Sequence, residues 1–181
     1  MNTLKAEKRS MDVKAKKLRR EGFVTGNLFG REIEGSIPLK FTKKEIEVLL
    51  KNNNKGSQVM LELDGKTYDA LIKEVDYNPL AHTVEEVDFQ ALVSNEKVHS
   101  VAEIVLHNTE NVVEGVLEQI LKEVSYKAYP SALVDKIDVD CGNLHLGDCI
   151  RVKDLEIAKN KDISIMTNPE SIIVNVIAVH N

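Results

Sequence analysis

Three groups of side chains have types and spacing that could support chemistry. The first is Cys141, His145 and Cys149, which recur every four residues. A closed structural zinc site needs four ligands, and no obvious fourth ligand lies nearby. The intervening sequence carries Gly142 and Gly147 and is typical of a turn and a strand. We therefore interpret the group as buried free thiols and a loop histidine, and we predict no metal site.

The second group is acidic and comprises Glu85, Glu86 and Asp88. In a strand, Glu86 and Asp88 would share one face while Val87 and Phe89 pack on the other. A hydrolase could use two such carboxylates, but it needs them in different environments within a cleft. Surface acids on an amphipathic strand are the simpler interpretation. The sequence also lacks the phosphate-loop, nucleophile-elbow and zinc-protease motifs, so we predict a protein that is not an enzyme and needs no cofactor.

The third group is cationic and lies near the start of the sequence. Residues 14–20, KAKKLRR, contain five Lys or Arg, and residues 1–31 hold nine of these against three acidic residues. The other 150 residues carry 15 basic and 26 acidic side chains, so the net charge of −5 is unevenly distributed. Lys and Arg bind phosphate, and Arg can also pair with a guanine edge. A solvated charged segment is the alternative, but a basic face on an acidic body favours a polyanionic partner.

The elements that must position these groups are mostly strands. Alternating apolar residues predict strands at 3–9, 33–41 and 82–93, and a hairpin over 58–75 that turns at Asp64-Gly65. Thr42 and Glu45 form a capping box that predicts a helix. Residues 11–20 could form a further helical turn or two, held down by Met11, Ala15 and Leu18. We expect a mainly β protein with few helices: an N-terminal β-barrel over 1–93 and a C-terminal β-rich domain over 97–181.

Composition restricts the cellular location of the protein and its possible modes of binding. No apolar run approaches the roughly 20 residues that span a bilayer, and the first residues lack the apolar core of a secretory signal. Two cysteines make no disulfide framework, so we expect a cytoplasmic protein. The absence of Trp, with four Tyr and four Phe, argues against a binding mode based on stacking aromatic side chains on single-stranded bases. These observations alone leave an RNA-binding β domain as the function to test.

Short motifs, in their order and spacing, resemble those of the bacterial 5S-rRNA-binding proteins of the large ribosomal subunit, a family that includes the general stress protein Ctc. The N-terminal motifs are Leu4-x-Ala6-x-x-Arg9, Leu18-Arg19-Arg20-x-Gly22 and Val87-Asp88-Phe89. The C-terminal half resembles the long, two-domain form of the family in residues 115–119 (GVLEQ), 138–139 (DV) and 144–148 (LHLGD). The likeness covers nearly the whole chain.

The resemblance implies an N-terminal barrel that binds 5S rRNA, related in fold to the anticodon-binding region of glutaminyl-tRNA synthetase. The C-terminal β domain has a less defined role. The implied partners are 5S rRNA, through a fragment carrying its loop E region, and the large subunit with its neighbouring proteins; no membrane and no small-molecule substrate is implied. The expected rRNA-binding residues are Arg9, Lys14, Lys17, Arg19, Arg20, Phe29, Glu86 and Asp88.

Three positions depart from the family pattern. Phe29 stands where the family has a tyrosine, Glu86 where it has a histidine, and Thr25 where it usually has a proline. Phe29 lacks a hydroxyl, and Glu86 would place an anion near phosphates, so we expect that restoring both residues tightens rRNA binding. We also expect Glu86 to lie across from Phe29 in the site. The alternative function is therefore a divergent stress or protein-interaction member of the family with weakened rRNA binding.

Overall fold

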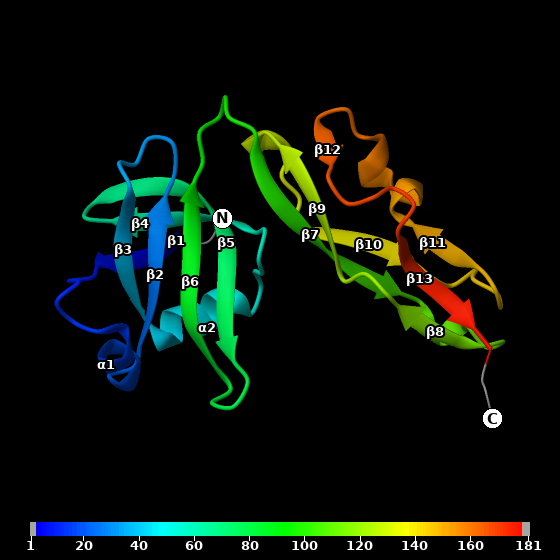
Figure 1. Cartoon of the computed structure of the whole chain (residues 1–181), viewed down its shortest axis with the longest axis horizontal. Helices are drawn as coiled ribbons and strands as arrows, with labels where there is room; N and C mark the ends of the chain where they lie inside the picture. The colour runs from blue at the N-terminus through cyan, green and yellow to red at the C-terminus, as the bar shows by residue number, and fades with distance from the viewer. Residues whose placement is uncertain (1–2, 179–181) are drawn as a thin grey trace. The chain divides into compact units, whose positions relative to one another are not determined.

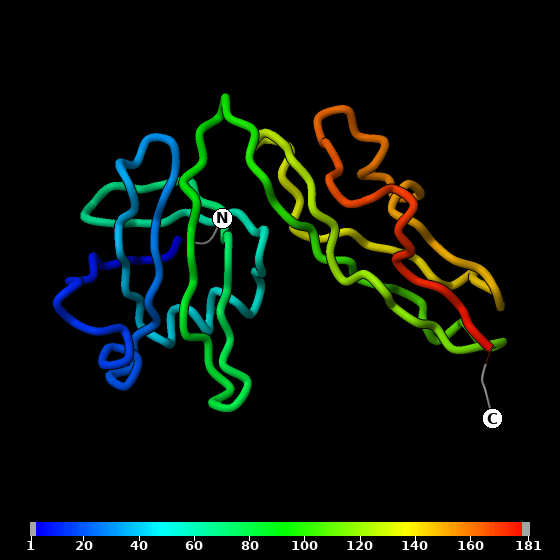
Figure 2. Tube along the Cα trace, viewed as in Figure 1, coloured from blue at the N-terminus to red at the C-terminus, as the bar shows by residue number. Residues whose placement is uncertain are grey.

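The computed structural model describes residues 3–178 and is mostly β, as predicted. The chain forms two compact units that divide between Glu96 and Lys97, in the segment between β6 (Thr83–Ala91) and β7 (Val98–His107). Figure 2 follows the chain from one unit to the other. The first unit contains 16 basic and 16 acidic residues, whereas the second contains 8 and 13. The acidic excess of the sequence therefore belongs to the second unit, and the first is balanced overall.

The first unit is a closed six-stranded barrel, which confirms the predicted N-terminal architecture (Figure 1). Its strand order is β1-β3-β2-β6-β5-β4, and a parallel pairing of β1 with β4 closes it. Because the barrel is closed, every strand pairs with a neighbour on each side over at least part of its length. The strands are β1 (Thr3–Lys8), β2 (Phe23–Phe29), β3 (Ser36–Thr42), β4 (Gln58–Leu63), β5 (Lys66–Asn78) and β6 (Thr83–Ala91).

The barrel interior is filled by the apolar residues that alternate with polar ones along each strand. Phe41 and Phe89 pack against each other with ring centroids 5.5 Å apart, and Val87 is fully buried. Gly26 lets β2 approach β6 closely, because a Cβ at this position would lie 1.9 Å from the Val87 carbonyl oxygen. The close approach keeps the outward-facing side chains of β2 and β6 next to each other.

The described part of this unit, from residue 3 onward, contains two α-helices. The capping box of Thr42 and Glu45 is present, as predicted, and begins α2 (Lys43–Leu50). The shorter helix α1 (Ala15–Arg20) packs against β2 through the buried Leu18. Met11, predicted to share this apolar stripe, is 69% exposed, because the chain at Met11 forms a turn before the helix begins.

The predicted turn at Asp64-Gly65 is also confirmed. It joins β4 to β5, with Leu63 and Lys66 as the last cross-strand partners. Asp64 and Gly65 both have positive φ, at 50° and 76°, as a type I′ hairpin turn requires.

The second unit is built from two small sheets and several 3₁₀ turns. One sheet has the order β10-β7-β9-β12 and the other β11-β13-β8. The strands are β7 (Val98–His107), β8 (Val116–Gln119), β9 (Glu123–Ala128), β10 (Lys136–Asp140), β11 (Cys149–Arg151), β12 (Ile163–Ile165) and β13 (Ile172–Ile177). The 3₁₀ turns are η1 (Thr109–Asn111), η2 (Pro130–Ala132), η3 (Val152–Asp154) and η4 (Glu156–Lys159).

The cysteines of this unit are free thiols, as interpreted from the sequence. Cys141 is buried at the end of β10, where burial raises the pKa of its thiol, and Cys149 is half-buried in β11. His145 is exposed in the loop between them. Within residues 3–178, no three His, Cys, Asp or Glu side chains gather as metal ligands, and no helix is long and apolar enough to cross a membrane.

Candidate nucleic-acid interface

The predicted site residues on strands come from one outer surface of the barrel. Along β2, Val24 and Leu28 point into the core, so Thr25, Asn27 and Phe29 point outward. Beside them on β6, Val87 and Phe89 are buried and Glu86, Asp88 and Gln90 point outward. We call these six side chains the β2–β6 face: Thr25, Asn27, Phe29, Glu86, Asp88 and Gln90. Thr25 lies on this side of the strand but is fully buried, because Arg19 covers it.

Arg19 attaches α1 to one end of this face by hydrogen bonds. Its Nε donates a hydrogen bond to the carbonyl oxygen of Glu85 at 3.1 Å. Its Nη2 donates to Thr25 Oγ1 at 3.3 Å and to Glu86 Oε2 at 3.2 Å. Its Nη1 lies 3.7 Å from Glu85 Oε2. Most donors of this guanidinium are therefore used inside the protein, and Arg19 joins the helix to both strands.

Glu86 has a partner in the folded protein. Its carboxylate is paired with Arg19, and both side chains are only about one-third exposed, at 31% and 30%. The parallel register of β2 and β6 places Glu86 beside Thr25, whose hydroxyl lies under the same guanidinium. Glu86 is thus part of the attachment of α1, and its negative charge is offset locally by Arg19.

The expectation that Glu86 lies across from Phe29 is wrong. The register places Phe29 beside Gln90, at the other end of β2. Four residues of extended chain separate Thr25 from Phe29, which is about 13 Å. Phe29 and Glu86, two of the three departures from the family pattern, therefore lie at opposite ends of the β2–β6 face, with Asp88 between them.

Asp88 links β6 to β2 at the middle of the face. Its Oδ1 accepts hydrogen bonds from the backbone N–H of Asn27 at 2.9 Å and from Asn27 Nδ2 at 3.1 Å. Its Oδ2 accepts no hydrogen bond from any described residue. The carboxylate therefore fixes β2 with one oxygen and offers the other as an acceptor to a donor outside the protein.

Arg9 lies next to Pro38 of β3, which in turn is the neighbour of Asn27 on β2. Its backbone N–H donates to the carbonyl oxygen of Pro38 at 2.9 Å, and Pro38 is the β3 partner of Asn27. Its Nη2 donates to the Val13 carbonyl oxygen at 3.3 Å, which steadies the loop that leads into α1. Its Nε is buried and has no partner among the described residues. Arg9 thus extends the row that runs from Asp88 through Asn27.

The exposed cations lie on and just before α1. Lys14, Lys16 and Arg20 are exposed and form no ion pair with any described residue. Lys17 is also exposed, and its Nζ lies 3.9 Å from Glu21 Oε1. Figure 1 shows α1 beside the first residues of β2, at one end of the barrel. The arrangement can hold a polyanion against the end of the β2–β6 face that carries Arg19.

The prediction from the sequence missed Asn27, Gln90 and Lys16. The alternation in FVTGNLF would have placed Asn27 on the same face as Thr25 and Phe29. The spacing of Lys16 and Arg20, four residues apart, would likewise have placed both on one side of a helix. The alternation along residues 86–90, EVDFQ, would likewise have placed Gln90 on the same face as Glu86 and Asp88.

Two family models match the chain, one to each unit. The model described as the ribosomal L25p family matches residues 4–89, and that of the C-terminal domain of ribosomal protein TL5 matches residues 97–180. Three bacterial relatives are each named large ribosomal subunit protein bL25. The relative from Carboxydothermus hydrogenoformans is 33% identical over 92% of this chain and 87% of its own length.

The other two relatives cover the chain to a similar extent. The protein from Exiguobacterium sibiricum is 32% identical over 91% of this chain and 74% of its own length. That from Listeria monocytogenes serotype 4b is 30% identical over 97% of this chain and 86% of its own length. The similarity therefore includes both units and the segment that joins them.

Proposed function

The chain belongs to the bacterial bL25 family of large-subunit ribosomal proteins, in its long, two-domain form, and we propose that its barrel binds 5S rRNA on the ribosome in the cytoplasm. The contact surface in this proposal is the β2–β6 face together with Arg9 and the cations of α1. The second unit would contact neighbouring components of the large subunit.

The observation that carries the proposal is the set of unpaired cations on and just before α1. Lys14, Lys16 and Arg20 have no acidic partner among the described residues, although the unit carries as many acidic as basic side chains. Such charges release counterions when they meet phosphates, so they supply affinity and position the protein on the RNA. They contact the RNA backbone in the proposed complex.

The β2–β6 face supplies groups that suit the groove surface of folded RNA. Asp88 Oδ2 can accept a hydrogen bond from a 2′-hydroxyl or a base amino group, and Phe29 offers a half-exposed ring. Neither group would attract bare phosphate. In this arrangement α1 holds the backbone while the face contacts sugars and base edges.

Arg19 has a positioning role in the proposed complex. Its Nε and Nη2 donors are occupied by Glu85, Glu86 and Thr25, so it acts mainly by holding α1 in place. Glu86 then supports binding through Arg19, and its charge is not left unpaired in the interface.

The alternative function is a stress-related or protein-interaction role with weakened rRNA binding, and it depends on both Glu86 and Phe29. Because Glu86 is paired with Arg19, only the missing hydroxyl of Phe29 still argues for weaker binding. The absence of one hydrogen bond corresponds to about 1 kcal/mol, which does not abolish an interface held by several cations. We therefore favour 5S rRNA binding.

The test is a filter-binding titration of the full chain with 5S rRNA from a relative's ribosome, over a series of KCl concentrations. A tRNA, compared at equal phosphate concentration, is the matched control. We expect 5S rRNA to bind more tightly than tRNA, with log affinity falling linearly with log salt. Equal affinity for the two RNAs, or no binding at low salt, would overturn the proposal and favour the alternative role.

A further inference from the structure

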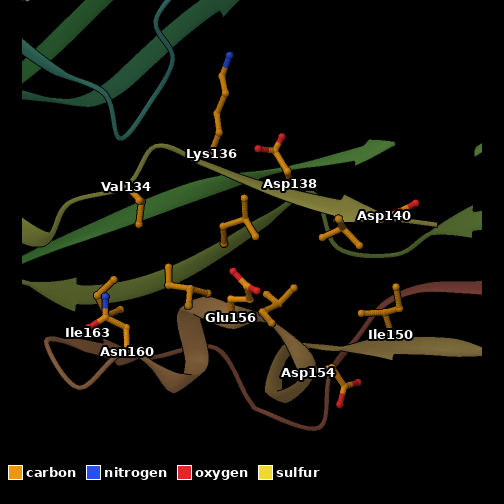
Figure 3. Close-up of a pocket in the computed structure, with 13 residues that line it drawn as sticks. Val134, Lys136, Asp138, Asp140, Ile150, Asp154, Glu156, Asn160 and Ile163 are labelled. Carbon is orange, nitrogen blue, oxygen red and sulfur yellow. The ribbon is translucent and has the colours of Figure 1, made fainter. Parts of the chain in front are cut away.

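The second unit contains a groove with an apolar interior. The groove has a volume of about 690 Å³ and lies between β10 and the segment that forms η3 and η4 (Figure 3). Its apolar lining includes Ile137, Val139, Ile150, Leu155, Ile157 and Ile163. Figure 3 shows Lys136 and Asp138 directed away from the groove, whereas Glu156 is directed toward it. The groove thus has an apolar interior and a polar rim.

One wall of the groove is an unpaired strand edge. Among the described strands, β10 pairs with β7 alone. Glu103 N donates to Asp135 O and Cys141 N donates to His107 O, so odd-numbered residues of β10 bond to β7. The backbone N–H and C=O groups of Lys136, Asp138 and Asp140 therefore point away from β7. Such a row of free donors and acceptors can pair with another extended chain.

The charges around the groove are mainly negative. Lys136 is the only cation among the lining residues, against Asp138, Asp140, Asp154 and Glu156. Asp138 Oδ1 lies 2.7 Å from His107 Nε2, and Asp154 Oδ2 accepts a hydrogen bond from the backbone N–H of Arg151, so each of these carboxylates keeps one oxygen for an outside donor. Glu156 has no partner among the described residues. Hydrogen bonds from Asn108 and Gly142 lower the pKa of Asp140, so it stays ionised at neutral pH. This rim is complementary to lysine and arginine side chains.

We propose that the groove is a docking site for an extended, basic segment of another protein, which adds a strand to the free edge of β10. Alternate apolar side chains of the segment would enter the groove between Ile137 and Ile157. Its Lys or Arg side chains would lie on the opposite face of the added strand, beside Asp138, while Glu156 adds negative potential at the groove. Backbone hydrogen bonds give such a complex affinity, while the pockets for alternate side chains give it specificity. This role goes beyond rRNA binding and uses residues of the second unit only.

The probe is a fluorescein-labelled peptide of twelve residues in which Lys and Val alternate, titrated with the full chain and followed by fluorescence anisotropy. The double variant Asp138→Lys/Glu156→Lys reverses two charges at the groove. The matched control Glu110→Lys/Glu118→Lys makes the same change at exposed positions of η1 and β8. We expect about tenfold weaker binding for the groove variant at low salt and less than twofold for the control. Equal effects, or no binding of the probe, would overturn the proposal.

Two versions of the peptide test strand addition directly, one N-methylated at every Val and the other at every Lys. Only one edge of an added strand faces β10, so one version should lose binding and the other should keep it. If both versions keep binding, or both lose it, the segment does not pair with β10. Sedimentation velocity of the chain alone tests a second copy as the occupant: a dimer abolished by Asp138→Pro would make β10 a self-interface and overturn the proposal.

Discussion

Arg19 Nη2 lies 3.2 Å from Glu86 Oε2, and this ion pair joins the short helix α1 to strand β6. A helix of six residues is too short to be stable by itself, so its orientation depends on such attachments and on the buried Leu18. Through this pair the Glu86 carboxylate supports a surface that should bind RNA, because it helps to orient α1. The cations of α1 are presented beside the β2–β6 face because Arg19 holds the helix there.

Replacing Arg19 with alanine should weaken both the fold and the proposed complex. The substitution removes three hydrogen bonds, to Glu85, Thr25 and Glu86, so we expect the free energy of unfolding to fall by about 1–2 kcal/mol and 5S rRNA affinity to fall roughly tenfold. Urea unfolding and filter binding measure the two effects. Glu86→Gln separates the possible roles of Arg19: weaker binding supports positioning, whereas tighter binding would mean that Arg19 contacts RNA once released.

Removing the unpaired cations should lower affinity without affecting the fold. For Lys14→Ala/Lys16→Ala/Arg20→Ala, we expect an unchanged Tm and a salt slope of log affinity that is smaller by roughly 2 to 3, about one for each phosphate that is no longer neutralised. The matched control is Lys44→Ala/Lys51→Ala/Lys66→Ala, which removes three exposed lysines from other parts of the same unit. A similar decrease of slope in the control would show that the chain binds RNA through net charge alone.

Two substitutions of Asp88 should separate its structural and binding roles. Asp88→Asn keeps an oxygen for the Asn27 N–H but removes the charged acceptor, so we expect normal stability and about tenfold weaker rRNA binding. Asp88→Ala leaves the Asn27 N–H without its partner and should also lower the free energy of unfolding by about 1–3 kcal/mol. Thermal unfolding and filter binding of both variants measure this. If Asp88→Asn binds as well as the wild type, Oδ2 does not contact the RNA.

Much of the site could be predicted from local patterns. The alternation along β6 separated Glu86 and Asp88 from the buried Val87, and the basic segment was evident from composition. The pairing of Arg19 with Glu86 could not be predicted, because 67 residues separate them and only the pairing of β2 with β6 brings them together. The same holds for the register that separates Phe29 from Glu86, which depends on the parallel pairing of β2 with β6.

The sequence was least informative about α1 and the second unit. The spacing of Met11, Ala15 and Leu18 fits a helix, but a turn before Ala15 leaves Met11 in solvent, so periodicity overstated the length of the element. In the second unit, β10 looked like any other strand. Its free edge appears only once its partners are known, because strand order is not encoded in the alternation of side chains.

Phe29→Tyr should tighten rRNA binding, whereas Glu86→His should not. A tyrosine adds a hydroxyl at a half-exposed position, worth about 1 kcal/mol or roughly fivefold in affinity if it reaches the RNA. Glu86→His removes the partner of Arg19, so we expect unchanged or weaker binding. Because the two positions lie at opposite ends of the face, their effects should add in a double-mutant cycle. Coupling between them would contradict the register of β2 and β6.

Tyr126 should make the second unit sensitive to alkali. Its buried hydroxyl donates to Val134 O at 2.6 Å and accepts from Val134 N at 2.8 Å. Burial raises the pKa of Tyr126, so its stabilising effect is complete below the unfolded value of about 10 and is lost as pH rises through the folded value. Tyr126→Phe should lower the free energy of unfolding by about 1–3 kcal/mol at pH 7.

To isolate this effect, the free energy of unfolding of Tyr126→Phe is subtracted from that of the wild type at each pH. Other groups that titrate in alkali are present in both proteins, so their contributions cancel. Urea unfolding followed by circular dichroism at pH 7 and pH 11 gives the two differences. We expect the stability advantage of the wild type to shrink at pH 11. A constant advantage would show that the hydroxyl does not lose its hydrogen bonds on ionisation.

The most direct test of the proposed interface is to record the backbone amide resonances of the full chain while 5S rRNA is added. We predict that shifts concentrate at residues 9–20, 25–29 and 86–90, and that they weaken as salt rises. The same titration of the triple variant lacking Lys14, Lys16 and Arg20 should need several-fold more RNA. Shifts confined to residues 97–178, or no shifts at low salt, would contradict the assignment of the rRNA interface to the β2–β6 face and α1.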